Sequence, residues 1–494
     1  MFVDQRPERS LAGLLVAQAA RQPDALALQQ GDERLTYHEL RQLVQQAAGA
    51  FAAAGVQPGA PVALLFQNAV DCVVACLGLA WLEAQVVPLE ADLGAERLAA
   101  MQQEIGFGWL AGRAAALEPL AGAAPQACRL TVDRAALAGG GPGPAPAPHR
   151  PNAVFVYHYT SGSTGLPKAA LHSQENLING GLIYEQTFRI SSADRILVPV
   201  PVLHSFGMVG GMVTALVTGA ALLLVERFVP RRLVQTLAEA RVTVLLAVPL
   251  MYEMLTFGQP PTKLDFSALR LCLATGAALP EPLTERFQRY FGQAIHHVYG
   301  CSEAGIIAAQ TPDDPPASRF SVGRLVVGAE LRVLDDAGHP QPAGEPGWLA
   351  VRTPAMFHGY FNNPEATGAV LSDGWYRSQD IGVLRDGYLY LSGRGDTFIN
   401  VGSKKVNPVE VEQVLCAHPQ VREAVVWAGT TTSASESVRA TVALSGTVAV
   451  AELIAFCRER LPAYKVPVAI EVVASLPRNA MGKIVRPSPA TSTA

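Results

Sequence analysis

Two hydrophobic periods alternate along the first part of the chain. Apolar residues recur at helical spacing from Leu11 to Ala20, which predicts a first helix. Short alternating runs at 25–29 and 34–37 lie on either side of a Gly-Asp turn and predict a hairpin. The sequence Thr36-x-x-Glu39 is then a capping box for the next helix. The chain therefore opens as a folded α/β region.

Strand-length apolar segments and helices continue to alternate through the middle of the chain. Strands that alternate with helices predict parallel sheets covered on both faces. The Gly/Pro/Ala-rich segment 139–151 has a composition that cannot pack, so it predicts a loop or linker. Strands are expected at 61–66, 85–89, 153–157, 169–172, 196–200, 220–225, 242–248 and 271–274, and helices at 71–82 and after His204.

From Leu331 the pattern changes to short β segments separated by turns, and beyond Asp396 it becomes a compact αβ unit. The predicted fold class is α/β, with a large N-terminal domain of parallel-type sheets, helices and a small β-rich subdomain, followed by a small C-terminal α+β domain. We place the domains at 1–395 and 396–494. In the second, helices are expected at 407–416 and 450–460, and strands at 421–427, 440–444 and 470–473.

The composition excludes several classes of function. The 494 residues are 49% hydrophobic and 16% charged, which is typical of an enzyme with a large core rather than of a disordered chain. The 38 basic and 42 acidic residues form no long block of one sign, so neither a nucleic-acid surface nor a polybasic membrane surface is indicated. Seven scattered cysteines without a C-x-x-C pattern, and an N-terminus without an apolar core, favour a cytoplasmic protein.

One segment favours a different class of protein. Residues Phe206 to Val225 carry no charge and have small residues at membrane-helix spacing, so by length alone they could span a membrane. The neighbouring prolines, His204 and four glycines instead favour a buried helix and a strand within a large domain. We expect no membrane span.

The stretch YTSGSTGLPK, Tyr159 to Lys168, has the composition of a polyphosphate-binding loop. Glycines let backbone N–H groups turn toward an anion, hydroxyls add donors, and Lys168 adds a positive charge. The spacing differs from that of the Walker loop. A flexible surface loop is the alternative, but the loop lies between two predicted strands, which favours the ligand-binding interpretation.

Three further sites lie where predicted strands end. His204 follows one strand beside a glycine-rich helix, although most histidines in apolar segments are core residues. The small-residue turn Gly276, Ala277, Ala278 lets backbone approach a flat ligand closely. In HVYGCSEAG, Glu303 is a candidate ligand of Mg²⁺, which takes one or two protein oxygens and fills its other positions with phosphate and water.

Five motifs in order resemble the adenylate-forming superfamily of acyl- and aryl-CoA ligases, adenylation domains and luciferases. The resemblance covers nearly the whole chain and includes a phosphate loop, a Tyr-Gly-x-Thr-Glu segment, a Tyr-Arg-Thr-Gly-Asp segment, a hinge and a C-terminal lysine motif. In this sequence they are YTSGSTGLPK, VYGCSEAG, WYRSQD, GRGDTFINVGSKKVNPVEVE and PRNAMGKIVR.

The resemblance implies a role for each matching residue. Asp380 would bind the ribose hydroxyls with Arg394 nearby, Asp396 would be the hinge of a mobile C-terminal domain, and Lys483 would reach the reacting α-phosphate. Thr164 and Glu303 would hold Mg²⁺. The ATP phosphates and adenine would be bound by Thr160, Ser161, Gly162, Ser163, Thr164, Gly165, Lys168, Gly276, Ala277, Ala278, Tyr299, Gly300 and Ser302. The acid would be bound by His204, Phe206, Gly207, Met208, Gly211, Gly276 and Ile306.

The implied reaction uses ATP and Mg²⁺ to convert a carboxylic acid to acyl-AMP and pyrophosphate, and then transfers the acyl group to a thiol. CoA is the expected acceptor. The phosphopantetheine of a separate acyl carrier protein is the alternative, because Gly402-Ser403 departs from the pattern of many CoA ligases. A non-catalytic nucleotide-binding module is a weaker alternative, since it would have no reason to keep Lys483.

The class of acid follows from the segment His204 to Gly219, which contains no acidic residue. A buried ammonium without a partner would cost several kcal/mol, so free amino acids are disfavoured. The glycines, Met208, Met212 and Ile306 are expected to leave an apolar cavity. We expect an uncharged aliphatic or aromatic acid of medium size.

Overall fold

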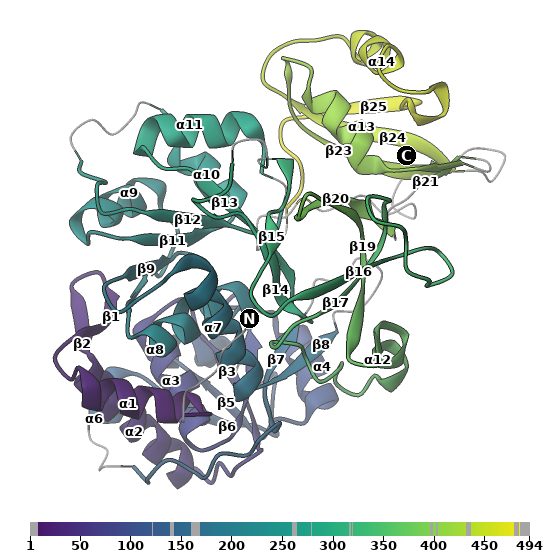
Figure 1. The fold of residues 1–494 in the computed structure, drawn as a ribbon. Coiled ribbons are helices and arrows are strands. Elements are labelled where there is room, and N and C mark those ends of the chain that lie inside the picture. Colours follow the sequence, from purple (N-terminus) through teal and green to yellow (C-terminus); the bar gives the residue numbers. More distant parts are fainter. Residues whose placement is uncertain are drawn as a thin grey trace. The chain divides into compact units, whose positions relative to one another are not determined.

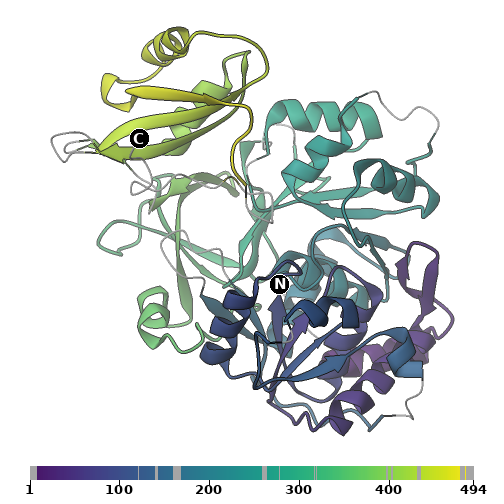
Figure 2. The same cartoon turned by 180° about the vertical axis from the view of Figure 1, so that it is seen from behind.

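The computed structural model describes residues 8–484 except 121, 139–142, 160–167, 259–263, 278, 316–317, 319, 396–398, 402–403, 431–435 and 479–483. This part of the chain forms two compact units (Figures 1 and 2). The first comprises residues up to 319, with 323–330 and 351–376, and the second comprises 320–322, 331–350 and the residues from 377 onwards.

The first unit contains a mostly parallel sheet of order β6-β5-β3-β4-β7-β8 (Figure 1). Only the β7–β8 pair is antiparallel. Around it lie α1 (Leu11–Arg21), α2 (Tyr37–Ala53), α3 (Val70–Trp81), α4 (Ala95–Ile105), α5 (Ala114–Leu117) and α6 (Arg134–Ala138). The strands are β3 (Pro61–Leu65), β4 (Gln85–Leu89), β5 (Trp109–Gly112), β6 (Cys128–Thr131), β7 (Val154–Tyr159) and β8 (Ala169–Ser173).

A second series of strands in this unit has the order β15-β14-β13-β12-β11-β9-β10-β1-β2. The strands from β13 to β1 run parallel, while β14 and β2 run antiparallel to their neighbours. They are β1 (Leu26–Gln30), β2 (Glu33–Thr36), β9 (Arg195–Val198), β10 (Ala221–Leu224), β11 (Val244–Ala247), β12 (Leu271–Ala274), β13 (Ile295–Cys301), β14 (Gly305–Ala309) and β15 (Arg324–Leu325). The accompanying helices are α7 (Gln174–Phe188), the π-helix η2 (Phe206–Val213), α8 (Thr214–Thr218), α9 (Pro230–Glu239), α10 (Pro249–Leu255), α11 (Glu281–Phe291) and α12 (Pro364–Val370).

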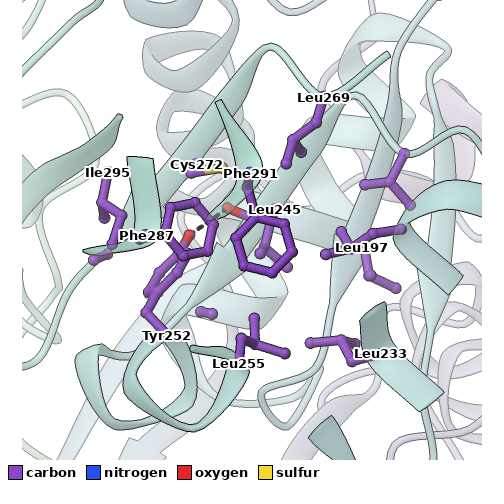
Figure 3. Packing of buried hydrophobic residues seen from close by; sticks show 14 of the residues in the cluster. Leu197, Leu233, Leu245, Tyr252, Leu255, Leu269, Cys272, Phe287, Phe291 and Ile295 are labelled. Atoms are coloured by element: carbon purple, nitrogen blue, oxygen red, sulfur yellow. Dashed lines mark hydrogen bonds between the residues drawn. The ribbon is translucent and has the colours of Figure 1, made fainter. Parts of the chain in front are cut away.

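Helices α9, α10 and α11 cover one face of these parallel strands with an aromatic core (Figure 3). Tyr252 packs edge-on against Phe287, with ring centroids 5.0 Å apart. Its hydroxyl lies 3.1 and 2.9 Å from the carbonyl oxygens of Leu245 and Leu273, so its polar end is satisfied inside the core. Tyr252 thereby joins α10 to both β11 and β12, and fixes the strand ends that carry the candidate site.

Several local expectations are confirmed. The hairpin is β1–β2, and α2 begins with the capping box in which the Thr36 hydroxyl accepts from the Glu39 N–H and the Glu39 carboxylate accepts from the Thr36 N–H. Cys72 and Cys76 are buried in α3, where burial raises the pKa of both thiols. The sequence patterns did not predict α4, β5, β6, α7 and α12.

The apolar segment 206–225 is not one continuous helix. It divides into η2, α8, a turn at Gly219 and strand β10. No helix in the described part of the chain is long and apolar enough to cross a membrane. The membrane interpretation of this segment is therefore not supported.

The Gly/Pro/Ala-rich segment is a loop, as expected, but the expectation that it cannot pack is wrong for its described residues. The Trp81 indole N–H donates to the Pro144 carbonyl at 2.9 Å, and the Ala147 N–H donates to the Trp81 carbonyl at 2.8 Å. Backbone groups of the loop thus obtain partners from the end of α3, which a composition argument cannot reveal.

The second unit contains strands of order β16-β17-β19-β20 and a C-terminal sheet of order β23-β24-β25. Helices α13 and α14 pack on one face of the C-terminal sheet, around Val411, Leu453, Val426 and Ala440. All buried members of this core lie at or beyond Ile399. Its elements are β16 (Glu330–Leu334), β17 (Gly347–Arg352), β19 (Trp375–Arg385), β20 (Tyr388–Arg394), β21 (Ile399–Val401), β22 (Lys404–Val406), α13 (Pro408–Cys416), β23 (Val421–Thr430), β24 (Glu436–Leu444), α14 (Val450–Arg458) and β25 (Ala469–Val473). The short β18 (Leu371–Ser372), which pairs with Trp375 and Tyr376, belongs to the first unit.

Candidate active site

The candidate residues of the first unit gather at one edge of the parallel strands. Strands β9, β12 and β13 run in the same direction, so their carboxyl ends meet at the same edge. His204 follows β9, Gly276 and Ala277 follow β12, and Tyr299 lies near the end of β13. Ligands of open α/β sheets bind outside the carboxyl ends of the strands. Gly276 has φ +90°, a conformation that suits glycine, and leaves the end of β12 exposed.

The turn between β13 and β14 holds the candidate metal ligand. Gly300 pairs with Ile306 after a register shift, and a side chain at position 300 would meet the Gly305 carbonyl oxygen. The two strands can approach this closely only with glycine at that position. Glu303 projects from the turn and is buried, with 7% of its surface exposed.

Strands β7 and β8 form the hairpin that carries the predicted phosphate loop. Tyr159 at the end of β7 pairs with Ala169 at the start of β8. Residues 160–167 lie outside the described part of the chain, whereas Lys168 is described and exposed. The loop therefore leaves and re-enters the sheet on adjacent strands, which fixes both of its ends.

A segment that the sequence analysis did not select, residues 353–361, joins the hairpin to the Glu303 turn. The Phe361 N–H donates to the Ala169 carbonyl, and the His358 N–H donates to the Leu171 carbonyl. On its other side, the Phe357 N–H donates to the Glu303 carbonyl at 2.8 Å. This segment therefore pairs with β8 and also holds the backbone of the turn.

Tyr360, within this segment, contacts both candidate phosphate-side charges. Its hydroxyl donates to Glu303 Oε1 at 2.8 Å, and its ring centroid lies 5.2 Å from the Lys168 ammonium nitrogen. Burial and the nearby Glu303 charge raise the pKa of Tyr360, so the phenol keeps its proton. A run of aromatic residues at 357–361 was the only signal for it in the sequence.

Three buried histidines, His158 in β7, His172 in β8 and His204 after β9, are neutral at pH 7 because burial lowers the pKa of each. The rings of His158 and His172 are 5.5 Å apart, and His172 Nε2 lies 2.7 Å from the Ser302 carbonyl oxygen, a contact that places the proton on Nε2. Burial lowers the pKa of His172 and of His204 to about 4. Burial, with His172 and His204 nearby, lowers the pKa of His158 still further below its usual value. His204 therefore presents a polar but uncharged group.

The structure corrects the interpretation of the glycines in the acyl segment. A Cβ on Gly207 would meet the Pro201 carbonyl oxygen, one on Gly210 would lie 3.1 Å from the Tyr184 ring, and one on Gly211 would lie 2.6 Å from Val198 Cγ2. These glycines allow η2 to pack closely on its neighbours, and they do not supply the open cavity that was expected. Phe206, Met208 and Ile306 are buried apolar residues.

Asp380 and Arg394 lie together in the second unit. They are partners across β19 and β20, with Arg394 Nε 3.6 Å from Asp380 Oδ1. Arg394 also donates to Gln379 Oε1 at 2.7 Å, which helps to orient the arginine. Their assignment to the ribose remains a prediction.

The other predicted site residues lie outside the described part of the chain, and their roles remain predictions. They are Thr160, Ser161, Gly162, Ser163, Thr164, Gly165, Ala278, Asp396 and Lys483.

The described residues fit Mg²⁺ bound together with a polyphosphate. No group of three or more His, Cys, Asp or Glu residues able to hold a metal occurs in the described part of the chain, which excludes an all-protein cage there. Mg²⁺ instead binds through one or two carboxylates plus substrate phosphates. A single buried carboxylate, Glu303, near the base of a glycine- and hydroxyl-rich hairpin loop meets this requirement.

Comparison with known proteins identifies the family of the chain. Residues 15–361 match the AMP-binding enzyme family, and residues 410–483 match the AMP-binding enzyme C-terminal domain. The chain is 31% identical to a probable CoA ligase of Humulus lupulus (97% and 95% of the two chains covered) and to a feruloyl-CoA synthase of Amycolatopsis sp (95% and 96%). It is 29% identical to an oxalate–CoA ligase of Arabidopsis thaliana (97% of each).

The similarity extends to solved structures. An O-succinylbenzoate coenzyme A synthetase from Bacillus subtilis, solved in complex with ATP and a magnesium ion, superimposes with a TM-score of 0.85 at 26% identity, covering 96% of this chain and 98% of that one. The fold and the two family matches together define an adenylate-forming enzyme. The chain belongs to the AMP-binding enzyme family and is an AMP-forming acid–CoA ligase.

Proposed function

We propose that this ligase activates an uncharged aliphatic or aryl carboxylic acid of medium size and transfers it to CoA. The observation that carries the proposal is the chemistry of the segment from His204 to Gly219. It contains no Asp, Glu, Lys or Arg, and burial keeps its one titratable side chain, His204, neutral at pH 7. The neighbouring Phe206, Met208 and Ile306 are apolar.

The relatives are named for acids of different charge, so the side chains of residues 204–219 are used to choose between these classes of acid. An oxalate–CoA ligase must accommodate a second carboxylate, which is costly to bury without a cationic partner. The feruloyl-CoA synthase is named for an aryl acid. Residues 204–219 include no Lys or Arg side chain that could pair with a second carboxylate. This favours an aryl or aliphatic monocarboxylic acid over a dicarboxylic acid.

The proposed roles of the site residues follow the order of the reaction. Residues Thr160 to Lys168 bind the ATP phosphates, Glu303 and Thr164 hold Mg²⁺, and His204 with its apolar neighbours binds the acid. Asp380 binds the ribose. Lys483 stabilises charge at the α-phosphate while the acid carboxylate attacks and pyrophosphate leaves. The CoA thiol then attacks the acyl carbonyl and releases AMP.

The domain division at Asp396 also remains a proposal. It is supported by the separate hydrophobic core of the C-terminal sheet, whose buried members all lie at or beyond Ile399. Limited proteolysis followed by mass measurement tests it. Protection of a fragment that begins near residue 396 supports the division, and a stable fragment that begins near residue 377 contradicts it.

A panel of aliphatic, aryl, dicarboxylic and amino acids in a pyrophosphate-release assay tests the acid class. Acyl-CoA formation is followed by mass in the same reactions. We expect pyrophosphate release and acyl-CoA with monocarboxylic apolar acids. Preference for oxalate or for an amino acid would overturn the proposed acid class while leaving the ligase chemistry intact.

A further inference from the structure

Lys168 and Glu303 are the two described charged groups proposed to act on the triphosphate, and they make no ion pair with each other in the structure. Each instead contacts Tyr360. Their opposite charges would attract strongly in a partly buried site. Because each contacts the phenol and they form no ion pair with each other, neither charge neutralises the other, and both remain available to a ligand.

Tyr360 is itself held firmly. Its N–H donates to Thr367 Oγ1 at 2.9 Å, and residue 360 bridges to Ala170 of β8. Its ring packs edge-on against Phe357, with centroids 5.1 Å apart. Its hydroxyl is held by Glu303 Oε1 at 2.8 Å. Backbone, ring and hydroxyl are therefore all restrained, as a group that orients other side chains must be.

The contact with Glu303 is specific in its direction. The Tyr360 hydroxyl donates its proton to Glu303 Oε1 at 2.8 Å. Within the described part of the chain, the Glu303 carboxylate makes no other hydrogen bond. Among the described residues, this phenol is therefore the group that orients the carboxylate through a hydrogen bond.

We propose that Tyr360 is a positioning residue of the adenylation site, whose hydroxyl orients Glu303 for Mg²⁺ and whose ring holds Lys168 for the ATP phosphates. This inference rests on the proposed roles of Glu303 and Lys168. Hydrogen-bond partners of metal ligands orient those ligands and tune their affinity. A cation over an aromatic face within about 6 Å is likewise held by electrostatic attraction.

Two substitutions separate the two contacts. Tyr360→Phe keeps the ring under Lys168 and removes the hydroxyl from Glu303, whereas Tyr360→Leu removes both. Tyr157→Phe is the matched control, because Tyr157 is a buried tyrosine of the same hairpin whose hydroxyl donates to Gln85 Oε1 at 2.7 Å and not to Glu303. Thermal unfolding of each variant establishes that it is folded.

The measurement is equilibrium binding of ATP at increasing Mg²⁺ concentration, without acid or CoA, so that it reports no turnover. For Tyr360→Phe, the Mg²⁺ concentration that gives half-maximal ATP binding is expected to rise about tenfold or more, while ATP affinity at saturating Mg²⁺ is retained. For Tyr360→Leu, ATP affinity at saturating Mg²⁺ should fall as well, because Lys168 loses its support. Tyr157→Phe should match the wild type.

The outcomes distinguish this inference from the function on which it rests. If Tyr360→Phe has the same Mg²⁺ dependence as the wild type and Tyr157→Phe, Tyr360 has no positioning role. If the wild type itself shows no Mg²⁺-dependent ATP binding, the proposed phosphate-side roles fail instead. Should Tyr360→Leu not fold, the nearly isosteric Tyr360→Phe still decides the question.

Discussion

Tyr159 and Ala169 are partners across the β7–β8 hairpin, so the predicted phosphate loop begins and ends on adjacent strands. A loop anchored in this way has little freedom at its ends, although glycine and hydroxyl residues fill its middle. Lys168 is the last residue before β8, so its backbone position is fixed by the hydrogen-bonded strand that follows. This placement suits a lysine that must meet a bound phosphate at a fixed distance.

Replacing Lys168 with methionine should therefore weaken ATP binding more than a surface charge change would. We expect the KM for ATP to rise about tenfold or more, since a charge-assisted hydrogen bond contributes roughly 1.5–3 kcal/mol. Initial rates of acid-dependent pyrophosphate release measure this. Arg231→Met on α9 removes an exposed cation and should leave the KM unchanged. If the two substitutions raised the KM for ATP equally, Lys168 would act only through the overall surface charge and not through a direct contact with ATP.

Replacing Glu303 with glutamine should impair the adenylation step. The amide keeps the shape of the side chain but removes the negative charge that Mg²⁺ requires, so pyrophosphate release should fall about 100-fold. The exposed Glu365 in the first turn of α12 gives the control, Glu365→Gln, which should retain activity. If the Glu303→Gln enzyme kept the Mg²⁺ dependence of the wild type, Glu303 would not be a ligand of the metal.

The buried histidines should make the fold sensitive to mild acid. His172 and His204 have pKa values lowered to about 4 in the folded chain, whereas the unfolded chain takes up these protons near pH 6.5. The unfolded state therefore binds more protons between these values, and the free energy of unfolding falls as the pH is lowered from about 6.5 to about 4. Each histidine contributes at most about 3 kcal/mol to this loss.

Denaturant unfolding at a series of pH values measures that slope. His172→Gln keeps a donor for the Ser302 carbonyl and removes the titrating group, so the dependence on pH should become shallower. The exposed His339 provides the control, and His339→Gln should leave the slope unchanged. An unchanged slope in His172→Gln would mean that this histidine is not the buried neutral group described above.

The close packing of η2 on β9 should appear as coupling between Gly211 and Val198. Gly211→Ala places a Cβ 2.6 Å from Val198 Cγ2 and should destabilise the fold by about 1–3 kcal/mol. Val198→Ala removes the obstructing methyl groups, so the double variant should be more stable than the sum of the two single effects predicts.

The control for this pair is Gly368→Ala in α12, where nothing lies within 4 Å of the added Cβ. It should be neutral or stabilising by up to about 1 kcal/mol, because alanine is the better helix former. Additive effects of Gly211→Ala and Val198→Ala would show that this glycine does not serve close packing.

Local patterns carried most of the correct sequence predictions. The Thr36–Glu39 capping box, the β1–β2 hairpin and the strand before the phosphate loop each depend on neighbouring residues, so the sequence could reveal them. Tyr360 could not be found in this way, because the carboxylate that it holds lies 57 residues earlier in the chain. Its contact exists only because residues 357–361 pair with β8.

The glycines of the acyl segment show a second limit. Gly207, Gly210 and Gly211 have no side chain to fill space, and the sequence alone suggested that the space is open. In the folded chain Pro201, Tyr184 and Val198 occupy it. The sequence shows that a glycine has no side chain, but only the tertiary packing determines whether a neighbouring residue fills the space beside it.

In the π-helix η2 the backbone hydrogen bonds reach five residues back instead of four, as in the bond from the Thr214 N–H to the Val209 carbonyl, to which the Thr214 hydroxyl also donates. Deleting one residue from this segment would let it wind as an α-helix, and the side chains within Phe206–Val213 would shift relative to the elements packed around them. Phe206 and Met208 would then face different neighbours without any change of residue type. A single-codon deletion is thus a route by which an enzyme of this architecture could acquire a differently shaped acyl site in one step.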